Sequence, residues 1–328
     1  MKFRNKLFYF ITAIEIIAVL CSGKYFYDKK ISERKVLGEM KIAVIDKDKV
    51  NSNPQDDLQY FWEYKPDEYV KDNPDWLGYK VVYKINSDSL NERFDYDVEK
   101  KTGIFRIITL GDSFTFGLYV NTGNNWPEIL EDKLNKEIKN DKISKFEVIN
   151  LGMGGYDVQY SVKRYKMRGL KYNPDMILWF ESGDSYSRFR ELMTPIINEC
   201  EDNLIEKKQE VKVFKKKDLD YCWDKSKETI EEKYGEKKLY GLLGTYWEEF
   251  LELKEKDVNF VYFGYFTTDY KSFMTKLFSG CKNCYLHDDV SDIDSLGGNL
   301  FDGHPNEKGH KIMAEEIFDY LIDNKLIN

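Results

Sequence analysis

From about residue 103 onward the chain alternates apolar runs with amphipathic segments. Short apolar runs typical of buried strands lie at 104–110, 146–151, 175–181, 258–265 and, more weakly, 283–290. Between them, apolar residues recur every three or four positions, as at Leu130, Leu134 and Ile138, which is the spacing of one helix face. A last helix of this kind is expected from Pro305 to about Lys325. Because strands that alternate with helices pair in parallel through right-handed crossovers, this part predicts a three-layer α/β sandwich with a mostly parallel sheet.

Two regions fall outside that alternation. Residues 29–100 are polar and rich in aromatic side chains, with one strand-like run at 78–86. We interpret them as an N-terminal extension that packs on the main domain, 101–328. The second region is an insertion at about 185–240. Its stretch from 199 to 238 holds 12 acidic and 11 basic side chains in 40 positions, and such balanced charge predicts solvated helices rather than a phosphate-binding patch.

Residues 1–28 have the pattern of a signal or membrane-anchor segment. The apolar run LFYFITAIEIIAVLCSG at 7–23 follows three basic residues, Lys2, Arg4 and Lys6. Burying the Glu15 carboxylate in a bilayer costs about 2.5–3.5 kcal/mol, whereas the strongly apolar residues of the run return about 3–5 kcal/mol in total. Insertion is therefore just favourable, and we expect an uncleaved anchor with the large domain outside the cytoplasm. A cleaved signal peptide and a buried helix of a cytoplasmic protein remain the alternatives.

Composition narrows the possible partners. Lys and Arg number 50 against 58 Asp and Glu, and the net charge of −8 argues against a nucleic-acid-binding protein, which carries a basic stripe. Five cysteines do not form a disulfide scaffold, and no second Cys or His pair completes a zinc site with Cys281 and Cys284. We therefore predict no metal and no cofactor. Outside the cytoplasm we expect a local disulfide between Cys281 and Cys284; Cys200 and Cys222 could close a second loop, and Cys21 would stay unpaired. In the cytoplasm all five cysteines would be free thiols.

One serine stands where a nucleophile is expected. The first strand of the main domain ends in ITLGDSFTFG at 108–117, so Ser113 lies just past a parallel strand and before a helix. Open α/β sheets bind ligands at this carboxyl edge, and the backbone N–H of Ser113 is free to stabilise an oxyanion there. Gly111 allows the tight turn, and Asp112 is expected to anchor it through side-chain to backbone bonds. The alternative interpretation is an ordinary turn that caps a helix.

A histidine near the end of the chain supplies the matching base. The chain holds three histidines, and His304 precedes a proline at a helix start with Asp302 two residues upstream. Serine nucleophiles need a base, usually His, and a carboxylate that fixes the His tautomer. We therefore assign His304 as the base and Asp302 as its partner. His310 is expected to be a packing or capping residue, and His287 a structural or exposed one.

These segments together resemble the blocks of the GDSL/SGNH hydrolase family. The three segments are GDSFTFG, NLGMGG and DGHPNEKGH, in this order, and the resemblance covers about 78–184 and 258–325. It implies a flavodoxin-like sandwich that carries a serine esterase or acetylhydrolase site. By this resemblance, Ser113 is the nucleophile and one oxyanion donor, Gly155 is the second donor, and Asp302 and His304 complete the triad.

Two departures from the family pattern affect the site. The third block of the family ends in Gly-x-Asn-Asp, and its Asn donates to the oxyanion, but Gly183 stands at that position here. Ser182 or Ser185 is a candidate replacement. The spacing from Asp302 to His304 is also one residue shorter than the commoner Asp-x-x-His.

Three functions follow from this set of residues. The leading hypothesis is a membrane-anchored serine esterase that acts on an O-acyl group, such as acetyl, of a glycan or lipid. The second is an O-acyltransferase of envelope glycans that uses the same triad. The third is a catalytically weak or dead glycan-binding protein, which the missing Asn favours and the intact triad disfavours. The partners expected are an acyl-ester or acylated-glycan substrate and a membrane reached through 7–23; the sequence makes no prediction of oligomeric state.

Overall fold

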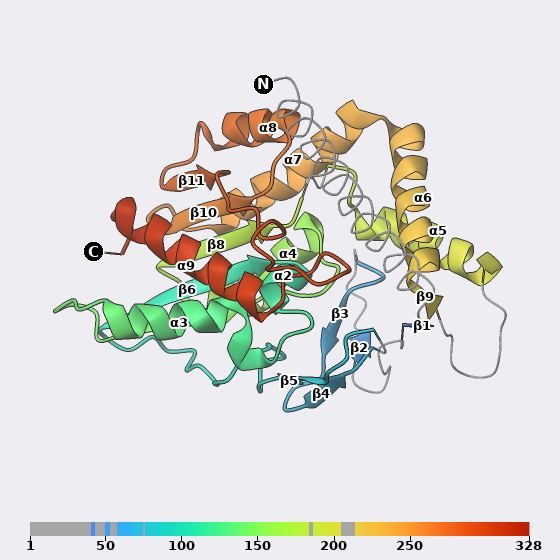
Figure 1. Cartoon of the computed structure of the whole chain (residues 1–328). Helices are drawn as coiled ribbons and strands as arrows, with labels where there is room; N and C mark the ends of the chain where they lie inside the picture. The colour runs from blue at the N-terminus through green and yellow to red at the C-terminus, as the bar shows by residue number, and fades with distance from the viewer. Residues whose placement is uncertain are drawn as a thin grey trace, which may run out of the picture.

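A five-stranded parallel sheet forms the centre of the molecule in the computed structural model (Figure 1). The structure describes residues 41–42, 50–52, 58–74, 76–183, 186–204 and 214–327. The sheet has the order β11-β10-β8-β6-β7, and every neighbouring pair is parallel. Its strands are β6 (Ile104–Gly111), β7 (Lys145–Asn150), β8 (Met176–Glu181), β10 (Asn259–Gly264) and β11 (Cys284–His287). All five apolar runs predicted as strands are strands of this sheet.

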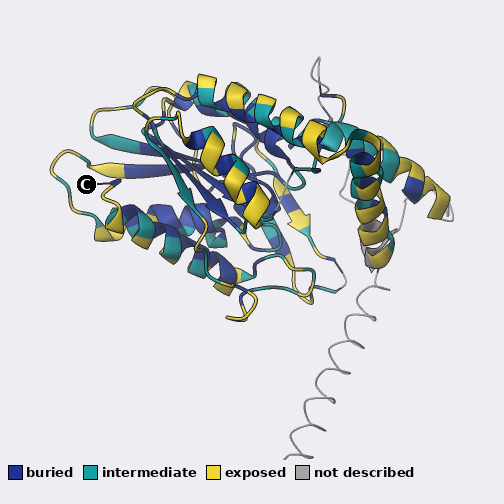
Figure 2. Ribbon diagram, turned by 90° about the horizontal axis from the view of Figure 1, so that it is seen from above, coloured by how far each residue is buried: buried dark blue, intermediate teal, exposed yellow. Residues whose placement is uncertain are grey.

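Helices cover both faces of the sheet and complete three layers. One face packs against α3 (Trp126–Glu137) and α9 (Glu307–Asp323). The other face packs against α4 (Val158–Arg164), α7 (Glu236–Leu253) and α8 (Thr268–Phe278). Figure 2 shows the strands buried between helices that expose only their outer sides. The predicted α/β sandwich is therefore confirmed.

The strands are continuous apolar runs because both of their faces are buried. In β8, Met176, Leu178 and Phe180 face α3 and α9. The alternate residues Ile177 and Trp179 face α7 on the other side. A strand that is covered on both faces has no position for a polar side chain, which is why these runs are readable in the sequence.

The predicted insertion forms α5 (Arg190–Leu204) and α6 (Lys216–Tyr234), which stand at one side of the sandwich in Figures 1 and 2. Cys200 on α5 is bonded to Cys222 on α6. The expected boundary at 240 falls inside α7, whose Leu239, Leu243, Trp247 and Phe250 are buried against the sheet. Because these apolar residues recur every three or four positions, α7 belongs to the sandwich rather than to the insertion.

The residues before the sandwich form small antiparallel ladders beside α2 (Ser113–Phe116) and α4. β2 (Val50–Ser52) pairs with β3 (Trp62–Tyr64), and β4 (Tyr69–Asp72) pairs with β5 (Val81–Lys84). A further short pair joins β1 (Lys41–Ile42) to β9 (Phe214–Lys215). A third core joins this extension to the main domain; it contains Leu58, Phe61, Tyr64, Val81 and Tyr83 from the extension with Phe116, Met153, Tyr156 and Tyr160.

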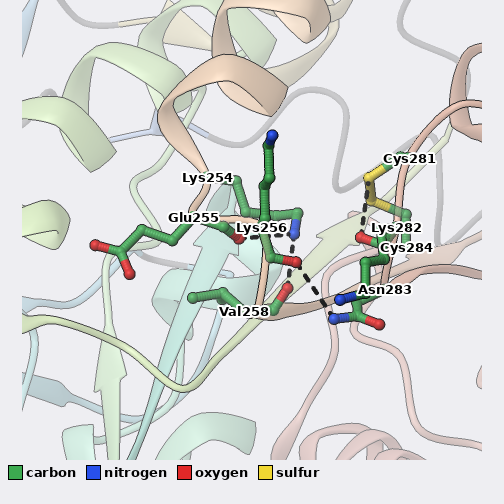
Figure 3. Close-up of a disulfide and its surroundings, with 8 residues drawn as sticks. All are labelled: Lys254, Glu255, Lys256, Val258, Cys281, Lys282, Asn283 and Cys284. Carbon is green, nitrogen blue, oxygen red and sulfur yellow. Dashed lines mark hydrogen bonds between the residues drawn. A yellow bond between two sulfur atoms is a disulfide. The ribbon is translucent and has the colours of Figure 1, made fainter.

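A second bonded cysteine pair lies at the amino ends of β10 and β11 (Figure 3). Cys281 and Cys284 close the turn before β11, and Asn283 of that turn donates to the carbonyl of Lys256. Lys254 donates to the carbonyls of Glu255 and Val258, and burial lowers its pKa. A cavity of about 440 Å³ opens here, lined by Leu251, Lys254, Lys256, Leu277, Gly280, Cys281 and Lys282. It lies at the sheet edge opposite to the one that carries Ser113.

The expected membrane anchor at 7–23 lies outside the described residues. Within the part of the chain that the structure describes, no helix has both the length and the apolar character needed to cross a bilayer.

An ion pair between the extension and α4 gives a stability prediction. Glu63 on β3 accepts from Arg164, and both side chains are almost fully buried; Arg168 also binds Glu63. Glu63→Ala would leave the Arg164 guanidinium buried without its carboxylate, and we expect it to lower the free energy of unfolding by about 3–5 kcal/mol. Urea denaturation measures the loss. Lys101→Ala, which breaks only the exposed pair with Asp97, is the matched control and should leave the urea midpoint nearly unchanged.

Candidate active site

Ser113 is the first residue of α2 and follows the carboxyl end of β6 directly. The side chain of Asp112 accepts a hydrogen bond from the N–H of Phe114 at 3.0 Å, so the anchoring role predicted for Asp112 is confirmed. The turn also requires a glycine at 111, where φ is +142°. A Cβ at that position would lie 2.4 Å from Oγ1 of Thr115. These contacts fix the turn that presents the serine at the sheet edge.

The structure brings Ser113, His304 and Asp302 into one chain of hydrogen bonds. Nε2 of His304 lies 2.9 Å from Oγ of Ser113, although 191 positions separate the two residues in sequence. Nδ1 of the same ring lies 2.8 Å from Oδ2 of Asp302. The Asp302 side chain is 8% exposed and that of His304 is 23% exposed, so the ring remains reachable while its carboxylate is shielded. This order of atoms is the one a proton relay from serine to histidine requires.

Gly303 explains how the short Asp-Gly-His spacing works. Its φ is +91°, a left-handed conformation that glycine adopts without strain. The turn lets Asp302 use both oxygens: Oδ2 meets the ring of His304, and Oδ1 accepts the backbone N–H of His304 at 3.2 Å. The tighter turn therefore compensates for the spacing that is one residue short, and Asp302 and His304 stay within hydrogen-bond distance.

Two aromatic rings hold His304 from its sides. The ring centroid of Phe114 lies 5.5 Å from that of His304, and Tyr119 meets the imidazole edge-on at 5.3 Å. Tyr119 has a φ of +69°, which is strained for a tyrosine. The extension holds it there, because Tyr83 Oη accepts its N–H at 3.0 Å and Tyr79 Oη donates to its carbonyl at 3.3 Å.

Sequence reasoning did not identify Tyr119 as a site residue. Its contacts with His304, Tyr79 and Tyr83 join segments far apart in the chain, and no local pattern marks them. The aromatic richness of the extension was the one available signal.

Gly155 lies in the loop after β7, with a φ of +75°. Asn150 ties this loop to the serine turn: its Oδ1 accepts the N–H of Gly152, and its Nδ2 donates to the carbonyl of Thr115, both at 2.9 Å. Across the described residues, the backbone N–H groups of Ser113 and Gly155 donate to no other protein group. Both amides are thus available to a ligand oxygen.

The structure gives Ser182 a different task from the one considered in the sequence. Its hydroxyl donates to Oδ2 of Asp112 at 2.6 Å, and Arg188 donates to the same oxygen at 2.8 Å. The single Ser182 proton is therefore used to support the Asp112 turn and is not free for an oxyanion. Ser185 lies outside the described residues. Among the described residues, nothing lies within 4 Å of the position that a Cβ would take on Gly183.

The other two histidines have structural surroundings. His310 is fully buried, and its Nδ1 accepts the N–H of Trp126 at 3.3 Å, so the predicted packing role is confirmed. Burial lowers the pKa of His310 to about 3, which keeps the ring neutral. His287 stacks on Tyr320 and lies 3.4 Å from a Glu316 oxygen. Among the described residues, no group of three or more His, Cys, Asp or Glu side chains is arranged to hold a metal ion.

Residues 107–317 match the model of the GDSL-like lipase/acylhydrolase family. Because this match spans well over half of the chain, the protein belongs to that family and is an ester-cleaving serine hydrolase. No curated protein matches the chain in sequence.

Several solved esterase structures are similar to the chain at low identity. A psychrotrophic esterase from Pseudoalteromonas sp. is 17% identical over 68% of this chain and 99% of its own, with a TM-score of 0.39. A catalytic mutant of an acetylxylan esterase from Geobacillus stearothermophilus is 14% identical over 67% and 95%, with a TM-score of 0.39. A two-domain esterase active on acetylated mannans is 14% identical over 69% and 51%, with a TM-score of 0.41. These values describe a similarity in fold alone.

The buried His310 makes stability depend on pH. The unfolded chain takes up a proton at this residue near pH 6.5, whereas the folded protein does not until about pH 3. The wild type therefore loses stability as pH falls below about 6.5, and between pH 7.5 and 4.5 this residue accounts for about 2–3 kcal/mol.

The comparison variant is His310→Gln, which keeps an acceptor for the Trp126 N–H but does not titrate. Urea denaturation at both pH values should show a smaller acid loss in this variant than in the wild type. Equal losses in the two proteins would mean that His310 is protonated in the folded state.

Proposed function

We propose that this member of the GDSL-like lipase/acylhydrolase family cleaves acyl esters with Ser113 as nucleophile, His304 as general base and Asp302 as the carboxylate that orients the base. The observation that carries the proposal is the unbroken chain of contacts from Ser113 Oγ through both ring nitrogens of His304 to Asp302. In this arrangement Asp302 holds the proton on Nδ1, so Nε2 is left free to accept the serine proton.

The reaction follows from the placement of these atoms. Ser113 Oγ attacks the ester carbonyl carbon while its proton moves to Nε2 of His304. The oxyanion that forms accepts hydrogen bonds from the backbone N–H groups of Ser113 and Gly155. When the intermediate collapses, His304 returns the proton to the leaving alcohol, and the acyl group stays on Ser113. A water molecule then attacks the acyl-enzyme with His304 again as base, which releases the acid and restores the serine.

The surroundings of the triad support a carbohydrate as the alcohol part of the substrate. Phe301, next to Asp302 in the chain, is 55% exposed, and Tyr79 of the extension is 44% exposed. The Tyr79 ring lies close enough to Asp302 and Glu307 for their charges, after burial, to raise its pKa. Exposed aromatic rings beside carboxylates offer an apolar face and polar acceptors together, which suits the C–H face and hydroxyls of a sugar ring. The favoured substrate is a short O-acyl group, such as acetyl, on a glycan; an acylated lipid is the less favoured carrier.

The same acyl-enzyme serves an O-acyltransferase, which is the second candidate. The exposed rings of Tyr79 and Phe301 favour it, because a sugar bound on such a ring near the triad can replace water as the acceptor. The formed triad argues against a purely glycan-binding protein. Competition between water and an added oligosaccharide for the acyl-enzyme separates the hydrolase from the transferase.

We further propose that the protein is attached to a membrane through residues 7–23, with the main domain outside the cytoplasm. The apolar run at 7–23 supports attachment. The bonded pairs Cys200–Cys222 and Cys281–Cys284 support an oxidising compartment, because disulfides persist there and are reduced in the cytosol.

The nucleophile and base are tested by substitution in the full-length protein. Ser113→Ala and His304→Ala should each lower kcat for p-nitrophenyl acetate by at least about 10³-fold, and by similar amounts, because triad residues act as a unit. Asp302→Asn should lose less. His287→Gln is the control histidine and should keep wild-type kcat. Undiminished turnover by Ser113→Ala would refute the assignment.

Location is tested by protease treatment of intact spheroplasts. The membrane fraction should contain the protein, and added protease should digest the main domain while a cytoplasmic marker survives. Protection of the main domain until detergent is added would reverse the proposed orientation.

A further inference from the structure

Arg190 lies against the glycine that is expected to bind the oxyanion. It is the first residue of α5, and its backbone N–H donates to Oδ2 of Asp157 at 2.6 Å. Its guanidinium carbon and Nη1 are each 3.7 Å from the position that a Cβ would take on Gly155, which is van der Waals contact. The cation therefore forms one wall of the loop that presents the Gly155 N–H.

The guanidinium of Arg190 forms no direct salt bridge with a described residue, although the carboxylate of Asp157 lies near it. Within the described part of the chain it makes no ion pair or hydrogen bond, whereas the neighbouring Arg188 binds Asp112. Burial lowers the pKa of Arg190; the charge of Asp157 partly opposes this, and the charge of Arg188 adds to it. An arginine nevertheless stays charged in proteins. A partly buried cation without a directly bonded counter-charge is costly to maintain, and such a charge is stabilised further when a ligand brings the opposite one.

The insertion holds this cation in place. The ring of Trp223 on α6 lies 5.5 Å from the guanidinium of Arg190 and 5.7 Å from that of Arg188. Such cation–π contacts orient the guanidinium plane without neutralising its charge. The neighbouring Cys222 is bonded to Cys200, which fixes α6 against α5. The guanidinium is thus positioned by two elements of the insertion, α5 and α6.

We propose that Arg190 supplies positive charge to the oxyanion side of this active site, in place of the side-chain donor that is missing at Gly183. The inference rests on the proposed function, in which negative charge develops on the carbonyl oxygen beside the Gly155 N–H. That charge is absent from the ester and present in the tetrahedral intermediate. Arg190 therefore stabilises the transition state more than the bound substrate, and its removal lowers kcat rather than raising KM.

The first test measures kcat and KM of full-length Arg190→Gln with p-nitrophenyl acetate, a neutral ester. We expect kcat to fall at least about tenfold, short of the 10²–10³-fold seen for a directly bonded donor, with KM within twofold of wild type. Arg190→Lys keeps the charge and should fall between the two. Lys276→Gln removes an exposed cation on α8 and controls for net charge; it should match wild type.

Two further measurements separate a chemical role from a structural one. Guanidinium chloride at tens of millimolar should raise kcat of Arg190→Ala, whereas equal sodium chloride should not. Gly183→Asn places an amide at the open position, and in the Arg190→Gln background it should restore part of kcat. If variants that keep the wild-type urea midpoint show neither rescue, Arg190 is only a packing residue.

The outcomes also distinguish this inference from the function on which it rests. Labelling of wild-type Ser113 by a fluorophosphonate probe tests the nucleophile alone. If Ser113 is labelled and Arg190→Gln keeps kcat, the role of Arg190 is wrong and the esterase proposal stands. If Arg190→Gln raises KM only for esters that carry a carboxylate, Arg190 recognises a substrate anion, and the oxyanion role is again wrong. If Ser113 is not labelled, the proposed function itself fails.

Discussion

The carboxylate of Asp112 joins the parts of the molecule on which the site depends. It accepts from the N–H of Phe114 in the serine turn, from the hydroxyl of Ser182 after β8, and from Arg188 before α5. Three separate segments therefore meet at one side chain that is 5% exposed. A buried carboxylate is tolerated when it is fully hydrogen-bonded. The hydrogen bonds that satisfy Asp112 hold the Ser113 turn against the end of β8 and the start of the insertion.

The wider fold could be predicted because its signal is local. A parallel strand buried on both faces must be a continuous apolar run, and the run at 104–110 became β6, Ile104–Gly111. The residues of the proposed triad were equally accessible, since Ser113, Asp302 and His304 lie in short motifs at strand and helix boundaries. The position of α7 was less clear, because its charged outer face continues the composition of the insertion while its buried face belongs to the sandwich.

The rest of the site could not be read from the sequence because it consists of contacts between distant segments. Tyr119 is held by tyrosines of the extension, and the Ser182 hydroxyl donates its hydrogen bond to Asp112, 70 positions away. The sequence shows the short spacing from Asp302 to His304, but the left-handed turn at Gly303 that makes it work is seen only in the backbone angles of the structure. Arg190 carried no sequence signal: the role proposed for it rests on its contact with Gly155 and on the lack of a direct ion pair with a described residue.

The extension and the insertion, the two segments added to the family core, contact different parts of the candidate site. The extension reaches the base, since Tyr79 and Tyr83 hold Tyr119 against His304. The insertion contacts the proposed oxyanion side of the site, since Trp223 holds Arg190 beside Gly155. Ser113 follows β6 and His304 lies in the loop before α9, but in the proposed reaction the two added segments position the imidazole and the charge near the carbonyl oxygen. The extension and the insertion are therefore the two segments in which we expect the rate and the substrate choice of this protein to be set.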